Sequence, residues 1–499
     1  MKKLLILLTV LLALGTSCKK DFLAVDEFNP NSASAVPANL VLPAALNNTA
    51  RNFTQGDGYN FIPLWYGLMS ISGGYSQPTN LTQYNLLASA YQGIWSNNYT
   101  NLLNYDYIEK QSTTEKNNPF KAIAKIMKVY LFENLVDTYG NIPYKEALQT
   151  GTGILKPKYD PQQDVYEDLV LQLDAAMNLI DTAPADADQV GNYDIIYHGD
   201  MTLWRKFANT LKLRLLVTQS DMSGRTSYIT GALATTTTTP ADYIGAGEGA
   251  MSNPGYVNST DKMNPFWENF YKQDGSQQAD GLGYYVAGQD ACDFLTANND
   301  PRKLQFFQPS TAGGTTVLGN YFGALILQPV PVTSKLGPGM LKAYNQSAPI
   351  LTDFESLFIQ AEAVARGLIP GDAKALYQSA VTQSIIYEGG ANGTAAAAGV
   401  YLAQLKPLVN YDLAPNKVQT IITQKWLSLN GLNPQSVWVD FRRTGFPDFL
   451  HFTADPARLS DTPPVRLLYP QSEISTNNDN VLANGDISLF TSKIFWQNR

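Results

Sequence analysis

The sequence predicts a mainly α-helical protein, built as a scaffold of tetratricopeptide-like helix pairs with a loop-rich region. Apolar residues recur at steps of three and four along several long segments, which is the period of one face of an α-helix. Two such segments near the C-terminal end follow one another after a short turn, as the paired helices of an α-solenoid do. No fixed-period consensus repeat is visible. With 44% hydrophobic and only 16% charged residues, the chain is expected to fold.

The chain opens with the pattern of an export signal. Two lysines precede an apolar run at residues 4–14, small residues follow at 15–17, and Cys18 comes next. The apolar run is too short to span a bilayer, which takes about 20 residues. Bacterial lipoprotein signals have this order, although Gly15 stands where they usually have Leu. We therefore predict a signal peptide at residues 1–17 and lipidation of Cys18; the alternative is an ordinary secretory signal.

Residues 18–39 are rich in Asn, Pro and Ser and lack apolar periodicity, which predicts an N-terminal tether. Residues 40–499 are expected to form one domain. The net charge of -8 makes nucleic acid an unlikely partner, because phosphate binding needs a basic surface. Cys18 and Cys292 are the only cysteines, so no disulfide framework is predicted.

Within the domain, the apolar period predicts five helices. They lie around residues 120–135, 165–180, 203–215, 357–364 and 373–381. Between residues 220 and 346 the helical period fades and Gly, Pro, Thr and Asn become frequent. We expect this segment to be a loop-rich insert. Loops on a rigid scaffold are where binding residues tend to lie.

The sequence shows no catalytic or metal-binding pattern. His198 and His451 are its only histidines, and neither belongs to a metal-binding or nucleophile motif. Cys292 is flanked by acids, which disfavours a reactive thiolate, so a buried small residue is expected there. A carboxylate pair for glycoside cleavage stays open as an alternative, because any chain with 43 acids could supply one. We predict a non-enzyme without cofactor or metal.

Six sequence blocks, taken in order, resemble the SusD/RagB family of nutrient-binding outer-membrane lipoproteins. The blocks are Cys-Lys-Lys-Asp-Phe-Leu at 18–23, Leu-Val-Asp-Thr-Tyr-Gly-Asn-Ile-Pro-Tyr at 135–144, Trp-Arg-Lys-Phe-Ala-Asn-Thr-Leu-Lys-Leu-Arg at 204–214, Asn-Asp-Pro-Arg at 299–302, Ala-Glu-Ala-Val-Ala-Arg-Gly at 361–367, and Trp-Val-Asp-Phe-Arg-Arg-Thr-Gly-Phe-Pro at 438–447 with Pro-Val-Arg-Leu-Leu-Tyr-Pro-Gln-Ser-Glu at 464–473. They span nearly the whole chain, and the pattern is most similar to the SusD-like subgroup.

The resemblance implies capture without catalysis. Such proteins are lipid-anchored to the outer membrane and exposed at the cell surface. They bind a nutrient glycan and deliver it to a TonB-dependent transporter. Helix pairs face the transporter and the ligand lies in loops on the outer side. Peptide capture on the same fold, a surface glycoside hydrolase and a pure scaffold for the transporter are the alternatives.

The family motifs carry no ligand residues over, so candidates come from chemistry. Sugar rings stack on flat aromatic side chains, and their hydroxyls bond amides and carboxylates. Two segments combine both kinds of residue, and we predict ligand contacts at Trp65, Tyr66, Tyr75, Tyr84, Trp267, Tyr271, Tyr284 and Tyr285. Other aromatics lie in helical patterns and are expected in the core: Trp95, Trp204, Trp426 and Trp438. Arg442 and Arg443, beside Asp440, are expected to hold the scaffold through fixed hydrogen bonds.

Overall fold

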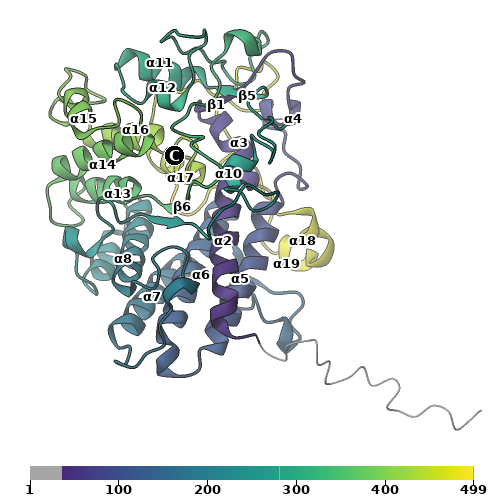
Figure 1. Cartoon of the computed structure of the whole chain (residues 1–499). Helices are drawn as coiled ribbons and strands as arrows, with labels where there is room; N and C mark the ends of the chain where they lie inside the picture. The colour runs from purple at the N-terminus through teal and green to yellow at the C-terminus, as the bar shows by residue number, and fades with distance from the viewer. Residues whose placement is uncertain (1–35, 280, 498–499) are drawn as a thin grey trace, which may run out of the picture.

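The computed structural model describes residues 36–279 and 281–497 (Figure 1). The predicted signal peptide, Cys18 and nearly all of the predicted tether lie outside these residues. Within the described part, no helix is both long enough and apolar enough to cross a membrane. The first helix, α2, covers Ala38–Thr54 and so begins before the predicted end of the tether at residue 39.

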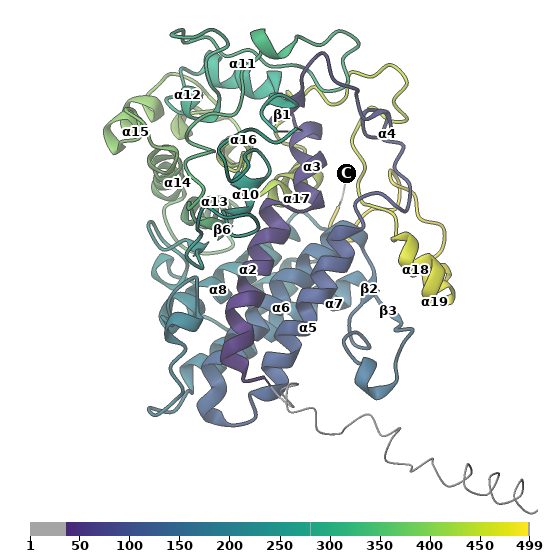
Figure 2. The ribbon, with the colours of Figure 1, turned by 45° about the vertical axis from the view of Figure 1, so that its right-hand side comes forward.

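Long helices that follow one another along the chain pack side by side (Figures 1 and 2). The first set comprises α5 (Gly93–Gln111), α6 (Asn118–Tyr139), α7 (Gln162–Asp181) and α8 (Met201–Thr218). The second set comprises α13 (Asp353–Ala365), α14 (Ala373–Glu388), α15 (Ala395–Leu402) and α16 (Lys417–Ser428). Each of the five predicted helices is confirmed, as α6, α7, α8, α13 and α14. Successive helix–helix contacts within each set give the tetratricopeptide-like scaffold.

The helix ends follow local sequence signals. Asp200 caps α8 by accepting hydrogen bonds from the backbone N–H groups of Thr202 and Leu203, at 2.9 and 3.2 Å. Gly140 ends α6 with a φ of +75°, a conformation that other residues adopt only at a steric cost. Helix α6 is buried over most of its surface, which places it at the centre of the scaffold.

Between the two sets the elements are short. The helices there are α9 (Thr226–Leu233), α10 (Pro265–Glu268), α11 (Gln289–Ala297) and α12 (Lys303–Phe306). In the described part of the chain, three two-stranded antiparallel sheets are present, two of which join segments far apart in the sequence. They pair β1 (Met69–Ile71) with β5 (Tyr285–Ala287), β2 (Ile142–Pro143) with β3 (Tyr159–Asp160), and β4 (Ala250–Ser252) with β6 (Ala348–Leu351). The remaining helices are α3 (Asp57–Trp65), α4 (Thr79–Thr82), α17 (Pro434–Thr444), α18 (Gln471–Thr476) and α19 (Asn478–Leu482).

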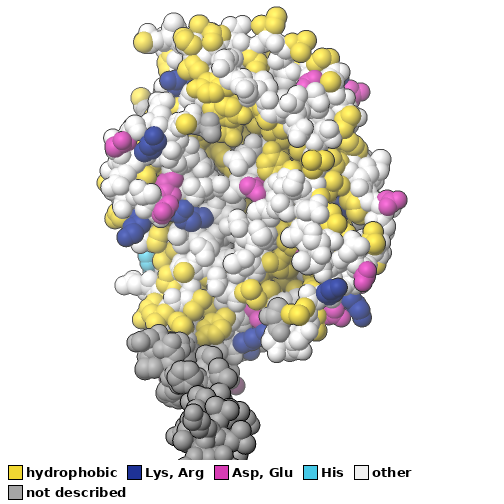
Figure 3. All heavy atoms as spheres, turned by 90° about the vertical axis from the view of Figure 1, so that its right-hand side faces the viewer, with side chains coloured by type: hydrophobic (Ala, Val, Ile, Leu, Met, Phe, Trp, Pro, Cys, Tyr) yellow, Lys and Arg dark blue, Asp and Glu magenta, His cyan; other side chains and the backbone are white. Residues whose placement is uncertain are grey.

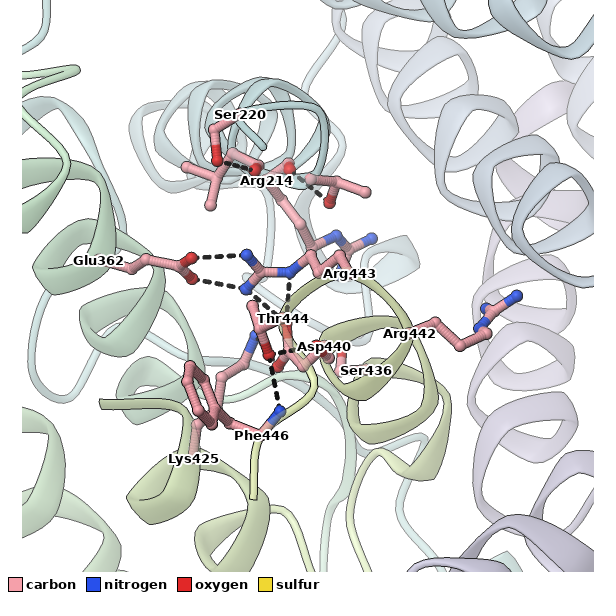
Figure 4. A network of polar contacts seen from close by, with 12 residues as sticks. Arg214, Ser220, Glu362, Lys425, Ser436, Asp440, Arg442, Arg443, Thr444 and Phe446 are labelled. Atoms are coloured by element: carbon pink, nitrogen blue, oxygen red, sulfur yellow. Dashed lines mark hydrogen bonds and ion pairs between the residues drawn. The ribbon is translucent and has the colours of Figure 1, made fainter. Parts of the chain in front are cut away.

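Buried ion pairs join the second helix set to α17. Arg443 on α17 donates to both carboxylate oxygens of Glu362 on α13, each at 2.5 Å, and to Asp440 Oδ1 at 2.7 Å (Figure 4). Lys425 on α16 pairs with Asp440 at 2.9 Å. All four side chains are at most 8% exposed. The network therefore fixes three helices against one another.

Arg442 points away from that network (Figure 4). Its Nη1 donates to the backbone carbonyls of Asp137 and Val465, each at 2.7 Å. Its guanidinium lies 4.0 Å from the centroid of the Trp438 ring. The expected structural role of both arginines is confirmed. The four tryptophans expected in the core are at most 5% exposed, and Cys292 is buried, with its thiol pKa raised by that burial.

Candidate ligand-binding site

Three of the predicted ligand residues are buried and are withdrawn from the candidate site. Trp65 is fully buried, with its ring edge-on to those of Tyr84 and Trp438. Tyr66 is 1% exposed, and the Tyr84 hydroxyl accepts a hydrogen bond from the Thr453 backbone at 3.1 Å. A ring enclosed by protein has no free face for a sugar. The prediction was wrong because Trp65 ends helix α3, which packs against α17.

The other five predicted aromatics reach solvent in two groups. Tyr75 is 38% exposed, and its ring lies edge-on to that of Tyr284, with centroids 5.5 Å apart. Tyr284 and Tyr285 are also edge-on, at 4.9 Å. The β1–β5 sheet positions this group, because Ile71 pairs with Tyr285 and the Ser72 N–H donates to the Tyr284 carbonyl at 3.0 Å. We call Tyr75, Tyr284 and Tyr285 the tyrosine cluster.

A glycine makes room for the tyrosine cluster. A Cβ atom built on Gly283 would lie 2.6 Å from the Tyr75 hydroxyl oxygen. That separation is too short for a real contact, so any side chain at this position would displace the Tyr75 ring. The absence of a side chain at Gly283 therefore lets Tyr75 lie against the backbone next to Tyr284.

Trp267 and Tyr271 form the second group. Their rings stack with centroids 4.3 Å apart and an interplanar angle of 22°. The four-residue spacing places both on one side of a helical turn. Asn264 caps that turn by accepting from the Trp267 N–H at 3.0 Å, and the Tyr271 N–H donates to the Trp267 carbonyl at 3.0 Å. Both rings are half-buried, so the stack keeps part of its surface open to solvent.

One folded segment holds the tyrosine cluster and the stacked pair together. The Gln278 N–H donates to the Phe270 carbonyl at 2.9 Å, the Gly281 N–H to Gln278 at 3.1 Å, and the Tyr285 N–H to Gly281 at 3.0 Å. The Phe270 ring also lies 6.3 Å from that of Tyr285. On the side of the molecule at the right of Figure 1, hydrophobic side chains gather in a band around a hollow (Figure 3).

A polar cavity of about 680 Å³ opens at Glu268 and Lys272, which follow Trp267 and Tyr271 in the sequence; the two rings do not line it. It is lined by Gln55, Asn258, Thr260, Asp261, Met263, Glu268, Lys272, Gln273, Asp274 and Gln278. Amides, carboxylates and an ammonium group supply both donors and acceptors, which is what a polyhydroxylated ligand needs. Sequence reasoning chose Trp267 and Tyr271 but did not find this cavity, although the closely spaced glutamines at 273, 277 and 278 were a signal for it.

Arg51 on helix α2 holds three residues that line this cavity in place. Its guanidinium donates to Glu268 Oε2 at 3.1 Å, to the Asp261 carbonyl at 2.8 Å and to Gln55 Oε1 at 2.9 Å. Thr260 donates to Gln273 Oε1 at 3.3 Å, which leaves the amide nitrogen of Gln273 for other partners. The residues that Arg51 contacts are therefore fixed by bonds, whereas Gln273 and Asp274 remain exposed at the opening.

Within residues 36–279 and 281–497, no group of three or more His, Cys, Asp or Glu side chains is placed to hold a metal ion. His451 Nδ1 lies 2.7 Å from Asp290 Oδ1, and the His451 backbone N–H donates to the same carboxylate at 3.0 Å. These two bonds tie the segment after α17 to helix α11. We therefore interpret the His451–Asp290 pair as a structural contact.

The sequence matches the SusD-like family, described as "Starch-binding associating with outer membrane", over residues 30–470. A search of curated proteins found no match. Among solved structures, a chitin-binding protein is 24% identical, with a TM-score of 0.75 over 93% of this chain and 100% of that one. A SusD homologue from Bacteroides fragilis is 22% identical, with a TM-score of 0.72 over 93% and 99%. A SusD/RagB family protein from Bacteroides thetaiotaomicron is 20% identical, with a TM-score of 0.74 over 93% and 100%.

Proposed function

Because this chain belongs to the SusD-like family, we propose that it captures a glycan at the cell surface, without catalysis, and passes it to a TonB-dependent transporter. The observation that carries this proposal is the stacked Trp267–Tyr271 pair, whose own segment also supplies Glu268, Lys272, Gln273 and Asp274 to a cavity lined with amides and carboxylates. The aromatic surface offers a platform for the apolar face of a sugar ring, and the cavity offers bonds to its hydroxyls.

The charges at the cavity favour a neutral glycan over an acidic one. Asp261, Glu268 and Asp274 line it, against a single lining cation, Lys272. Arg51 offsets Glu268 through their ion pair. A uronate or sulfated sugar would therefore meet one carboxylate in excess of the cations, which repels it. Starch and chitin oligosaccharides are suitable first probes, because the family is described as starch-binding and one similar structure is a chitin-binding protein.

The first prediction is that the purified chain binds a neutral polysaccharide with a Kd in the micromolar to millimolar range, about 4–8 kcal/mol. A capture protein must release its cargo, and an open aromatic platform supplies little more. Electrophoresis through gels that contain soluble starch, glycol chitin or polygalacturonate measures this as retarded migration. We expect retardation by one of the neutral polymers and none by polygalacturonate.

The same protein samples separate the competing functions. Release of reducing sugar from the retarding polymer would favour a glycoside hydrolase. Binding of casein-derived peptides, together with free migration in every polysaccharide gel, would favour peptide capture. Either result contradicts the proposed glycan-capture function.

Delivery of the glycan requires a membrane anchor and a surface that contacts the transporter. We propose that Cys18 carries the anchor and that the helical scaffold provides the contact surface. Lipid chains on Cys18 would hold the chain at the outer membrane, where more than one acyl chain is needed for stable anchoring. The scaffold presents apolar side chains to solvent, such as Leu103 on α5 at 47% and Leu171 on α7 at 62% exposure. A long-lived complex with a transporter should bury more than about 2,000 Å² in total.

The second prediction is that the tagged chain co-purifies with a TonB-dependent transporter from gently solubilised outer membranes. The variant Cys18→Ser should lose fatty-acid labelling and leave the membrane fraction, because the lipid chains proposed to anchor the protein would be absent. A different lipoprotein carrying the same tag controls for carry-over. Membrane retention of Cys18→Ser with unchanged labelling, or recovery of the wild-type chain without any transporter, would contradict the proposed delivery function.

A further inference from the structure

A second cavity, of about 430 Å³, is lined by residues of the scaffold helices α5, α6 and α7 and of the loop at residues 144–152. Figure 2 shows these three helices and the strand β2 that precedes the loop. The lining of this second cavity shares no residue with that of the polar cavity at Glu268 and Lys272. Its volume lies within the usual range of small-molecule sites, about 300–1,000 Å³. The proposed glycan capture makes no use of it.

One wall of this second cavity is built from charged side chains. Lys125 and Lys128, three residues apart on α6, face Asp106 and Glu109, three residues apart on α5. The ammonium of Lys128 lies 2.9 Å from Asp106 and 3.2 Å from Glu109, and that of Lys125 lies 2.8 Å from Glu109. Four lysines and two acids line the cavity, which leaves two positive charges in excess.

These lysines retain bonding capacity. Lys125 donates to Glu109 and to Gln172, and Lys128 donates to Asp106 and Glu109, so each ammonium uses two of its three N–H groups in the bonds of the described chain. Burial alone would raise the pKa of Glu109, but Lys128 and Lys125 hold it below its usual value. The two lysines and two acids of this wall balance one another, and each ammonium keeps one N–H group for a further acceptor, while Lys110 and Lys145 supply the excess positive charge of the lining.

Part of the remaining lining is apolar, and one residue of the roof, the loop at residues 144–152, has a strained backbone. Val129, Phe132 and Leu169 are buried residues of α6 and α7 that form apolar lining. Leu148 in the roof has a φ of +60°, a left-handed conformation that a residue with a side chain adopts only at a steric cost. Strained residues of this kind gather at ligand-binding sites, where the strain is part of the site.

We propose that this second cavity binds a small carboxylate with an apolar body. The carboxylate would take the remaining N–H groups of Lys125 and Lys128, and the apolar body would lie on Phe132 and Leu169 beneath Leu148. Two sources share this chemistry: a free apolar acid, and the C-terminal residue of a peptide.

Titration calorimetry on the full chain tests the ligand class with four probes: N-acetyl-leucine, N-acetyl-leucinamide, acetate and N-acetyl-Gly-Gly-Leu. We expect N-acetyl-leucine to bind with a Kd near or below about 1 mM, and the amide and acetate to bind at least about tenfold more weakly. Binding of N-acetyl-Gly-Gly-Leu as tight as that of N-acetyl-leucine assigns the site to a peptide C-terminus. Exclusion of this longer probe assigns it to a free acid.

Two variants locate the binding. Lys128→Gln removes a carboxylate donor, and Leu148→Gly removes the roof side chain while suiting the positive φ, so the fold is not threatened. Each should weaken N-acetyl-leucine by about tenfold. The matched controls Lys158→Gln and Leu155→Ala, at exposed positions that do not line the cavity, should bind as the wild type does.

Three results would overturn the assignment. The first is that N-acetyl-leucine does not bind at concentrations up to about 10 mM. The second is that N-acetyl-leucine and its amide bind equally well. The third is that the Leu148→Gly variant and the Lys128→Gln variant are both folded and both bind N-acetyl-leucine with wild-type affinity. A melting curve for each variant shows that it is folded.

Discussion

In urea at pH 7, the variant Glu362→Gln should unfold with a free energy about 3–5 kcal/mol lower than the wild type, the usual effect of removing one partner from a buried ion pair. Glu362 is 1% exposed and accepts from Arg443 through both oxygens, each at 2.5 Å, and from Arg366 Nε at 2.7 Å. The amide nitrogen of Gln would face a guanidinium donor, the Gln oxygen would accept one hydrogen bond at most in place of the charged pair, and Asp440 would be the carboxylate that remains on Arg443. Circular dichroism during urea unfolding measures the difference.

A surface ion pair supplies the matched control. Asp412 pairs with Lys374 at 2.5 Å, and their side chains are 62% and 43% exposed. Asp412→Asn should therefore cost no more than about 1 kcal/mol. Equal effects of Asp412→Asn and Glu362→Gln would contradict a structural role for the buried network around Arg443.

The pH dependence of stability gives an independent check on Glu362. Burial raises the pKa of this carboxyl, but Arg443 and Arg366 lower it by more, from 4.5 to about 2. Because the folded-state pKa lies below the unfolded one, the stabilisation is complete above pH 4.5 and is lost as the pH falls towards 2. The stability difference between wild type and Glu362→Gln should shrink over that range. A difference that stays constant would contradict the ion-pair explanation.

Glycan affinity should fall by about 100-fold in the double variant Trp267→Ala, Tyr75→Ala. Each stacked aromatic contributes on the order of 1 kcal/mol or somewhat more, counting its geometry and its buried area. Both rings reach solvent, and Trp267 lies on α10 whereas Tyr75 lies in the loop after β1, so their losses should be nearly additive. Calorimetric titration with the oligosaccharide that the wild type binds measures the change.

Tyr193→Ala is the matched control for this loss, because Tyr193 is 39% exposed, like Tyr75, and lies outside both aromatic groups. Its affinity should equal that of the wild type, and the melting curves of all variants should coincide within a few degrees. Full affinity in the double variant would remove Trp267 and Tyr75 from the site, while leaving the family assignment intact.

Apolar periodicity predicted the scaffold well where a helix buries a continuous apolar stripe, as α6 and α8 do. It failed for α5, whose buried face carries Asn98 and Asn101. Asn101 donates to the Ala45 carbonyl and to the Thr49 hydroxyl of α2, each at 3.0 Å. Polar bonds between helices thus replace apolar contacts there, and the sequence pattern loses its period.

The ligand site was only partly predictable, because burial depends on contacts between distant parts of the chain. Trp65 is enclosed in part by Trp438, which no local pattern around residue 65 reveals. The polar cavity likewise joins Gln55 at the end of α2 to a segment some 200 residues further on. A prediction from residue type chose the solvent-exposed Trp267 and Tyr75 as well as the buried Trp65 and Tyr84. Only the folded structure shows which of these side chains are accessible to a ligand.

A crystal structure of the chain with its bound oligosaccharide would decide where the ligand lies. We expect a sugar ring against the open face of Trp267 or Tyr271, with hydroxyls bonded to Gln273, Asp274 or Gln278 in the polar cavity. A glycan bound elsewhere, with both rings and the polar cavity uncontacted, would contradict the proposed capture site.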